Sequence, residues 1–101
     1  MDAWLYRLQE IVPDAPWKEE TEKAHYAYMG ELLADGRLIL SGSIPEPLTG
    51  TIIFESADED QAREVMMRDP LVTAGVMRPT LHGFYVGCLR GGTEVNELTQ
   101  G

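Results

Sequence analysis

The fold is decided by residues 50–76, which read GTIIFESADEDQAREVMMRDPLVTAGV. The apolar run Gly50–Glu55 is rich in β-branched and aromatic residues and predicts a strand. Ser56–Glu59 then has the form of a capping box, in which the serine hydroxyl caps an early amide and the glutamate reaches back. We therefore expect a helix that begins at this box and continues to about Arg68.

This helix should end at Asp69, because Pro70 disfavours helical geometry in the residue before it. Its apolar stripe consists of Ala62, Val65 and Met66. Asp69 falls at the next step of that stripe, so its side chain is expected to face inward. Asp69 and Pro70 also suit the N-cap and first position of a short helical turn. That turn continues through Ala74 and ends at Gly75.

Towards the N-terminus, alternation predicts a strand over Ala3–Glu10, and prolines predict a loop over residues 13–16. A helix follows over Lys18–Asp35, with Gly36 as its stop and glutamates in its first turns, where the helix dipole favours negative charge. Its apolar stripe consists of Tyr28, Met29, Leu32 and Leu33. Counted back by three and four residues, the stripe passes through His25, which we therefore expect to face the core.

Two further strands are predicted over Arg37–Ser41 and Val76–Val86. The segment Ser43–Thr49 carries two prolines and is expected to be irregular, and Pro79 indicates an irregular start or an edge position for the last strand. The resulting order is β-α-β-β-α-β. It predicts an α+β, ferredoxin-like domain over residues 1–89, in which two helices cover one face of a four-stranded antiparallel sheet.

Both faces of the predicted sheet look apolar. In the third strand Ile53 points opposite to Ile52 and Phe54, and the last strand is apolar on both sides as well. An apolar sheet face needs a cover, and the chain has no further helix to supply one. We therefore expect a homodimer with two sheets packed face to face. The polar tail 90–101 is expected to be disordered or to lie as an arm on the partner.

The chain carries 17 acidic and 8 basic residues, a formal net charge of −9. This balance argues against nucleic acid and anionic membranes as partners, because both are bound through clustered lysine and arginine. Cys88 is the only cysteine, which excludes an intramolecular disulfide and indicates a reducing compartment. The first residues lack a signal-peptide pattern and no apolar stretch is long enough to span a bilayer, so we expect a cytoplasmic protein.

Five motifs follow one another along the chain. They are His25–Tyr28, Asp35–Leu38, Ser41–Ser43, Ala57–Arg63 and Asp69–Val76. In order and content they resemble the YCII-related family, and the most specific is the last, an Asp-Pro to Ala-Gly run directly after an Ala-Arg helix. Two positions depart from the family pattern, Ser43 in place of proline and Leu71 in place of an aromatic residue. The resemblance implies a ferredoxin-like fold, a dimeric α/β barrel, and a pocket that holds a histidine and an aspartate.

Some domains of this kind look like enzymes that act on small ring compounds with acid–base or dehalogenating chemistry. His25 is the candidate catalytic base, because a neutral imidazole can accept a proton near neutral pH. Asp69 is the candidate orienter of its second nitrogen, since its stripe faces the same sheet. A simpler interpretation of each residue stays open, with His25 as a hydrogen-bonded core residue and Asp69 as an N-cap.

Further candidates for binding a substrate are Tyr28, Ser41, Gly42, Ser43 and Arg78. They offer hydroxyls, backbone amides and a guanidinium to a polar or anionic group. No nucleotide-binding or nucleophile-elbow motif is present, and His82 has no ligand-like spacing, so we expect no cofactor and no metal. The sequence thus predicts a small-molecule enzyme that uses His25 and Asp69 on a small carbonyl or aromatic compound. The alternative is a non-catalytic dimeric module that binds a ligand or a partner protein.

Overall fold

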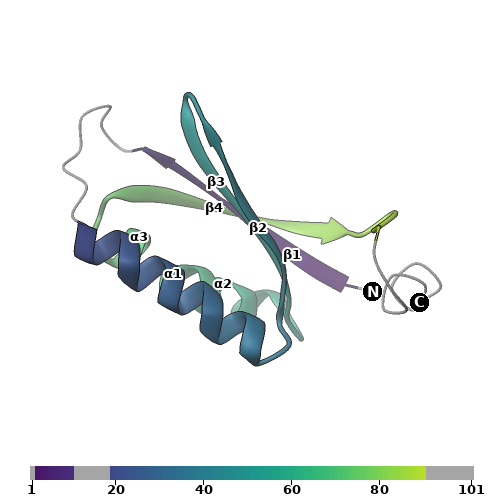
Figure 1. The fold of residues 1–101 in the computed structure, drawn as a ribbon. Helices are drawn as coiled ribbons and strands as arrows, with labels where there is room; N and C mark the ends of the chain where they lie inside the picture. The colour runs from purple at the N-terminus through teal and green to yellow at the C-terminus, as the bar shows by residue number, and fades with distance from the viewer. Residues whose placement is uncertain (1, 11–18, 91–101) are drawn as a thin grey trace.

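The computed structural model describes residues 2–10 and 19–90, with strands and helices in the predicted order (Figure 1). The elements are β1 (Asp2–Glu10), α1 (Glu19–Ala34), β2 (Leu38–Pro45), β3 (Leu48–Glu55), α2 (Glu59–Met67), α3 (Pro70–Thr73) and β4 (Met77–Tyr85). The strands form one antiparallel sheet in the order β2-β3-β1-β4, and the helices lie on one face of it. The predicted α+β, ferredoxin-like fold is confirmed.

The core lies between this helical layer and the sheet. Strands β1 and β3 contribute Tyr6, Leu8, Ile52 and Phe54, and the helices contribute Met29, Leu32, Ala62, Val65, Met66 and Leu71. The rings of Tyr6 and Phe54 meet edge to face with centroids 5.8 Å apart, a geometry that aromatic pairs prefer. Alternation in β1 therefore sends its even-numbered side chains towards the helices.

Two details of the helices differ from the sequence prediction, the N-cap of α2 and the exposure of Leu33. Asp58, rather than Ser56, is the N-cap of α2, and its carboxylate accepts a 2.8 Å hydrogen bond from the Gln61 amide. Asp58 occupies the extended residue directly before the helix, which is the position that a capping side chain needs. Helix α2 ends at Met67 with Arg68 as its C-cap, in agreement with the predicted end at about Arg68. Leu33, predicted in the apolar stripe, is 64% exposed because it lies beyond the edge of the buried face of α1.

The expected irregular segment over Ser43–Thr49 is instead a hairpin. Strands β2 and β3 stay paired as far as Pro45 and Leu48, and the turn between them holds a cis Glu46–Pro47 bond. Proline is tolerated here because β2 is an edge strand, so one side of its backbone has no ladder partner. The same reason explains Pro79, which lies in β4 at the other edge of the sheet.

The face of the sheet turned away from the helices carries Leu5, Leu40, Ile44, Ile53 and Phe84, as the strand register requires. Leu40 and Ile44 are each about half exposed, whereas Ile53, in the middle of the sheet, is buried by its neighbours. No helix among residues 2–10 and 19–90 covers this face. We call it the open face.

Some predictions concern residues outside this description. The loop over residues 13–16 and the tail from residue 91 onward lie outside the described residues, so both stay predictions. None of the described helices combines the length and apolar character needed to cross a membrane. The cytoplasmic location stays a prediction.

Gly30, within α1, and Gly36, shortly after it, should respond in opposite ways to substitution by alanine. Gly36 has φ +73°, a left-handed conformation that suits glycine, whereas Gly30 lies within the helix with open space around it. We expect Gly30→Ala to raise the free energy of unfolding by about 0.5–1 kcal/mol. Gly36→Ala should lower it by about 1 kcal/mol, because alanine is strained at positive φ. Urea unfolding measures both, and a change of the same sign in the two variants would contradict this account of the turn.

Candidate active site

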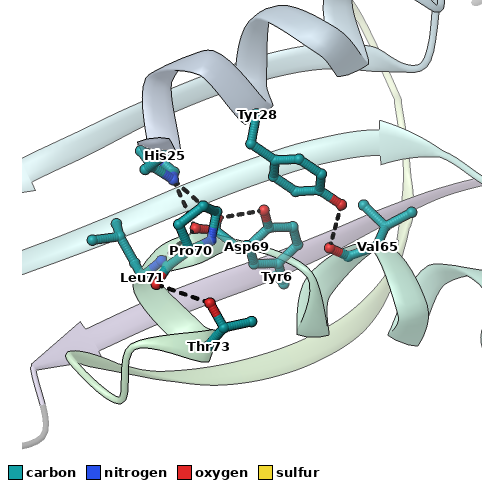
Figure 2. Close-up of polar contacts among 8 residues, drawn as sticks. All are labelled: Tyr6, His25, Tyr28, Val65, Asp69, Pro70, Leu71 and Thr73. Carbon is teal, nitrogen blue, oxygen red and sulfur yellow. Dashed lines mark hydrogen bonds and ion pairs between the residues drawn. The ribbon is translucent and has the colours of Figure 1, made fainter. Parts of the chain in front are cut away.

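The side chains of His25 and Asp69 meet beneath α1. Nδ1 of His25 lies 2.9 Å from Oδ1 and 3.0 Å from Oδ2 of Asp69, so the ring faces both carboxylate oxygens (Figure 2). The Asp69 side chain is fully buried, and that of His25 is 13% exposed. The contact joins α1 to the α2–α3 junction across 44 residues of sequence.

Local sequence fixes the position of Asp69. It is the N-cap of α3, and its Oδ1 accepts a 2.9 Å hydrogen bond from the Leu71 amide. Pro70 holds the first position of that helix, where a missing N–H costs nothing. Gly75, at φ +71°, ends the turn as predicted. The backbone at the start of α3 therefore fixes the position of the carboxylate.

A third element reaches the same carboxylate. The hydroxyl of Tyr6, on β1, donates a 2.8 Å hydrogen bond to Oδ2 of Asp69 (Figure 2). Burial raises the pKa of Tyr6 well above its usual value, and the negative charge of Asp69 and the hydrogen bond to it act in the same direction. The phenol therefore stays protonated and acts as a donor.

These donors determine which nitrogen of His25 carries a proton. Asp69 accepts from an O–H and an N–H, and an ionised carboxylate has only acceptor sites. The nitrogen facing it must then be a donor, so the hydrogen of a neutral His25 is on Nδ1. In that tautomer Nε2, on the other side of the ring, carries a lone pair that can accept a proton.

His25 lines a cavity of about 430 Å³ between the helices and the sheet, which we call the main cavity. Its volume is in the range of sites for small ligands. The lining comes from α1, α3 and the helix-facing side of the sheet. It consists of Leu8, Glu22, His25, Tyr26, Ser41, Gly42, Ser43, Leu48, Gly50, Ile52, Leu71 and Met77.

The predicted binding residues divide into two groups. Ser41, Gly42 and Ser43 line the main cavity with His25. Tyr28 does not, because its hydroxyl donates a 2.7 Å hydrogen bond to the Val65 carbonyl (Figure 2). Burial raises the pKa of Tyr28, which keeps this donor protonated. Arg78 is exposed and pairs across the sheet with Gln9 on the open face, away from the main cavity.

Sequence reasoning missed Tyr6, Glu22 and Tyr26. Alternation puts Tyr6 on the same side of β1 as Leu8, but the partner of Tyr6 lies 63 residues away and no local pattern connects the two. Glu22 and Tyr26 sit near His25 at helical spacings of three and one, so the signal for Glu22 was its i, i+3 relation to the candidate base. Glu22 was overlooked because acidic residues in the first turn of a helix are common, since they interact favourably with the helix dipole.

Among the described residues, no three histidine, cysteine, aspartate or glutamate side chains gather in a way that could hold a metal ion. His82 pairs with Leu5 on the open face, so the two histidines of the chain lie on opposite sides of the sheet.

The fold and this site define a class: a small ferredoxin-like domain with a histidine–aspartate pair at the wall of a cavity between helices and sheet. The family model of the YCII-related domain matches residues 5–81. The chain belongs to that family.

A similar solved structure is the 5-chloro-2-hydroxyhydroquinone dehydrochlorinase TftG from Burkholderia phenoliruptrix AC1100, in complex with 2,5-dihydroxybenzoquinone. The TM-score is 0.65 at 18% sequence identity, and the alignment covers 91% of this chain and 97% of that chain. At this identity the likeness shows a shared fold. A comparison with curated protein sequences gives no match.

The hydrogen bond from Tyr6 to Asp69 leads to a prediction. We expect Tyr6→Phe to lower the free energy of unfolding at pH 7 by about 1.5–3 kcal/mol, because a buried carboxylate loses one of its donors. The raised pKa of Tyr6 adds a pH dependence. Its contribution to stability is fully present below the ordinary phenol pKa of 10.0 and is lost as pH rises further. Above that pH, the stability of the wild type should fall more steeply than that of Tyr6→Phe, by about 1.4 kcal/mol per pH unit.

Urea unfolding from pH 7 to 11.5 measures both effects. Tyr85→Phe is the matched control, since Tyr85 is 81% exposed and should leave stability at pH 7 unchanged. Equal slopes for the wild type and Tyr6→Phe above pH 10 would show that the Tyr6 phenol is not held in its protonated form.

Proposed function

We propose that this protein is a small-molecule enzyme in which His25 moves a proton to or from a small carbonyl or aromatic compound. The observation that carries the proposal is the two-oxygen contact between His25 and the buried Asp69 at the wall of the main cavity. A base held in one tautomer and one orientation, beside a space of ligand size, has the geometry that general acid–base catalysis needs.

Each residue has a separate part in the proposed reaction. Asp69 holds the imidazole by accepting from Nδ1 and stabilises the positive charge that forms when Nε2 takes up a proton. Tyr6 and the Leu71 amide donate hydrogen bonds that hold the Asp69 carboxylate in place. Ser41 and Ser43, on β2, line the main cavity with His25, so their hydroxyls can hydrogen-bond to an oxygen of the ligand.

The comparisons support the same class of chemistry. The structural neighbour is named a dehydrochlorinase and was solved with a dihydroxylated ring compound. Loss of HCl from an organic compound requires that a base take up a proton, which is the part proposed here for His25. The family and the geometry thus favour a hydroxylated or carbonyl-bearing ring as the ligand.

A non-catalytic module is the competing interpretation. In that case His25 and Asp69 would form a buried polar pair that only fixes the fold. The described site favours the enzyme because His25 contacts the main cavity, whereas a purely structural pair needs no access to a ligand.

The test uses cyclohexanone, whose protons next to the carbonyl exchange with D₂O when a base removes them. We expect the wild type to accelerate this exchange, followed by ¹H NMR, and His25→Gln to lose at least about tenfold of the acceleration. His82→Gln is the matched control, since His82 lies on the open face. Equal rates for His25→Gln and the wild type would favour the non-catalytic module.

We further propose that the protein is a homodimer in which two open faces pack together. The open face exposes Leu40 and Ile44 by 53% and 52%, and no described helix shields it. Apolar side chains in a contiguous patch of this kind gain stability when a partner removes them from water. A second copy supplies a surface of the same size and character.

Sedimentation at micromolar concentration measures this assembly. We expect the wild type to sediment as a dimer and Leu40→Glu as a monomer, because the variant places a charge in the packed face. Leu33→Glu is the control, since Leu33 is an exposed leucine of α1 in the helical layer. A monomeric wild type would refute the proposed dimer, and a dimeric Leu40→Glu would move its interface away from the open face.

A further inference from the structure

We propose that Glu22 makes the main cavity selective for uncharged ring compounds and against carboxylates. The inference rests on the proposed function, because it concerns the ligand of the same cavity. Glu22 lies three residues before His25 and four before Tyr26 on α1, so all three side chains share one face of the helix. All three line the main cavity.

The charges around the main cavity are unbalanced. Among its described lining residues Glu22 is the one acidic side chain, and none is lysine or arginine. A carboxylate-bearing ligand would lose part of its hydration there without gaining a cationic partner from these described residues, which is unfavourable. It would also be repelled by Glu22, and the net charge of −9 adds a repulsive field over the whole molecule.

His25 does not supply the missing positive charge. When its ring is protonated, the charge is balanced by Asp69, whose carboxylate lies 2.9 Å from Nδ1. The pair is therefore neutral with a protonated ring and negative with a neutral ring. In both states Glu22 gives the described lining of the main cavity a net negative charge. This arrangement is the opposite of the arginine clamps that bind carboxylates.

The remaining lining suits an uncharged flat ring with polar substituents. Leu8, Ile52 and Met77 form an apolar floor on the sheet, and Gly50, opposite Ser43, adds no side chain to it. The hydroxyls of Ser41 and Ser43 can each donate and accept a hydrogen bond, as a phenol or carbonyl oxygen requires. Neutral polar groups are thus recognised at β2 while the ring lies on the floor.

The experiment compares two ligands that share a 1,4-dihydroxybenzene ring. Hydroquinone is uncharged at pH 7, and 2,5-dihydroxybenzoate adds one carboxylate. Dissociation constants are measured by ¹H–¹⁵N NMR titration for the wild type, Glu22→Gln and Glu20→Gln. Glu20→Gln is the matched control, because Glu20 lies in the same first turn, changes the net charge equally and does not line the main cavity.

We expect the wild type to bind hydroquinone on the order of tenfold more tightly than 2,5-dihydroxybenzoate, as repulsion between two charges at short range predicts. Glu22→Gln should reduce that ratio severalfold by strengthening the binding of the benzoate alone, and Glu20→Gln should keep it. Raising the salt to 0.5 M should also reduce the ratio in the wild type.

Three results would overturn the inference: a wild type that binds both ligands equally, equal ratios in Glu22→Gln and Glu20→Gln, or no binding of hydroquinone. The cyclohexanone exchange is scored independently. A wild type that binds both ligands equally but keeps an exchange activity that depends on His25 refutes the role of Glu22 alone, whereas exchange that does not depend on His25 refutes the proposed function.

Discussion

A single buried carboxylate organises this domain. Asp69 is fully buried, and an ionised group in that position is tolerated only when hydrogen bonds replace the water it has lost. Its donors come from three elements, Tyr6 on β1, His25 on α1 and the Leu71 amide at the start of α3. The layer of helices and the central strand of the sheet are therefore joined through two oxygen atoms.

The same contacts make the fold and the candidate site inseparable at Asp69. The side chain caps α3, anchors β1 and orients the imidazole, so its removal changes a helix end, a strand contact and the base together. His25 is different, since it lies at the wall of the main cavity and its loss leaves Asp69 with Tyr6 and the Leu71 amide. A substitution of His25 can thus distinguish a role in chemistry from a role in the fold, whereas a substitution of Asp69 affects both.

Local patterns predicted the parts of this arrangement that depend on neighbours in sequence. Helical periodicity turned His25 and Asp69 inward, and the Asp69-Pro70 pair and Gly75 marked the ends of α3. The length of the β2–β3 hairpin was missed because of its prolines. Whether a strand tolerates proline depends on whether it lies at the edge of the sheet, and no local pattern contains that information. Tyr6 as a donor and Glu22 as part of the lining were missed because each depends on packing between distant segments.

The Tyr6 hydroxyl also affects the register in which β1 pairs with its neighbouring strands. Apolar alternation in β1 fixes which side of the strand faces the helices, but a slip by two residues would preserve that alternation. Such a slip would bring Leu8 or Trp4 to the place of Tyr6. Leucine has no donor, and the larger indole does not present an O–H at that point. A misaligned strand would leave a buried acceptor unmatched, so the polar contact distinguishes the native pairing from shifted versions that hydrophobicity alone would accept.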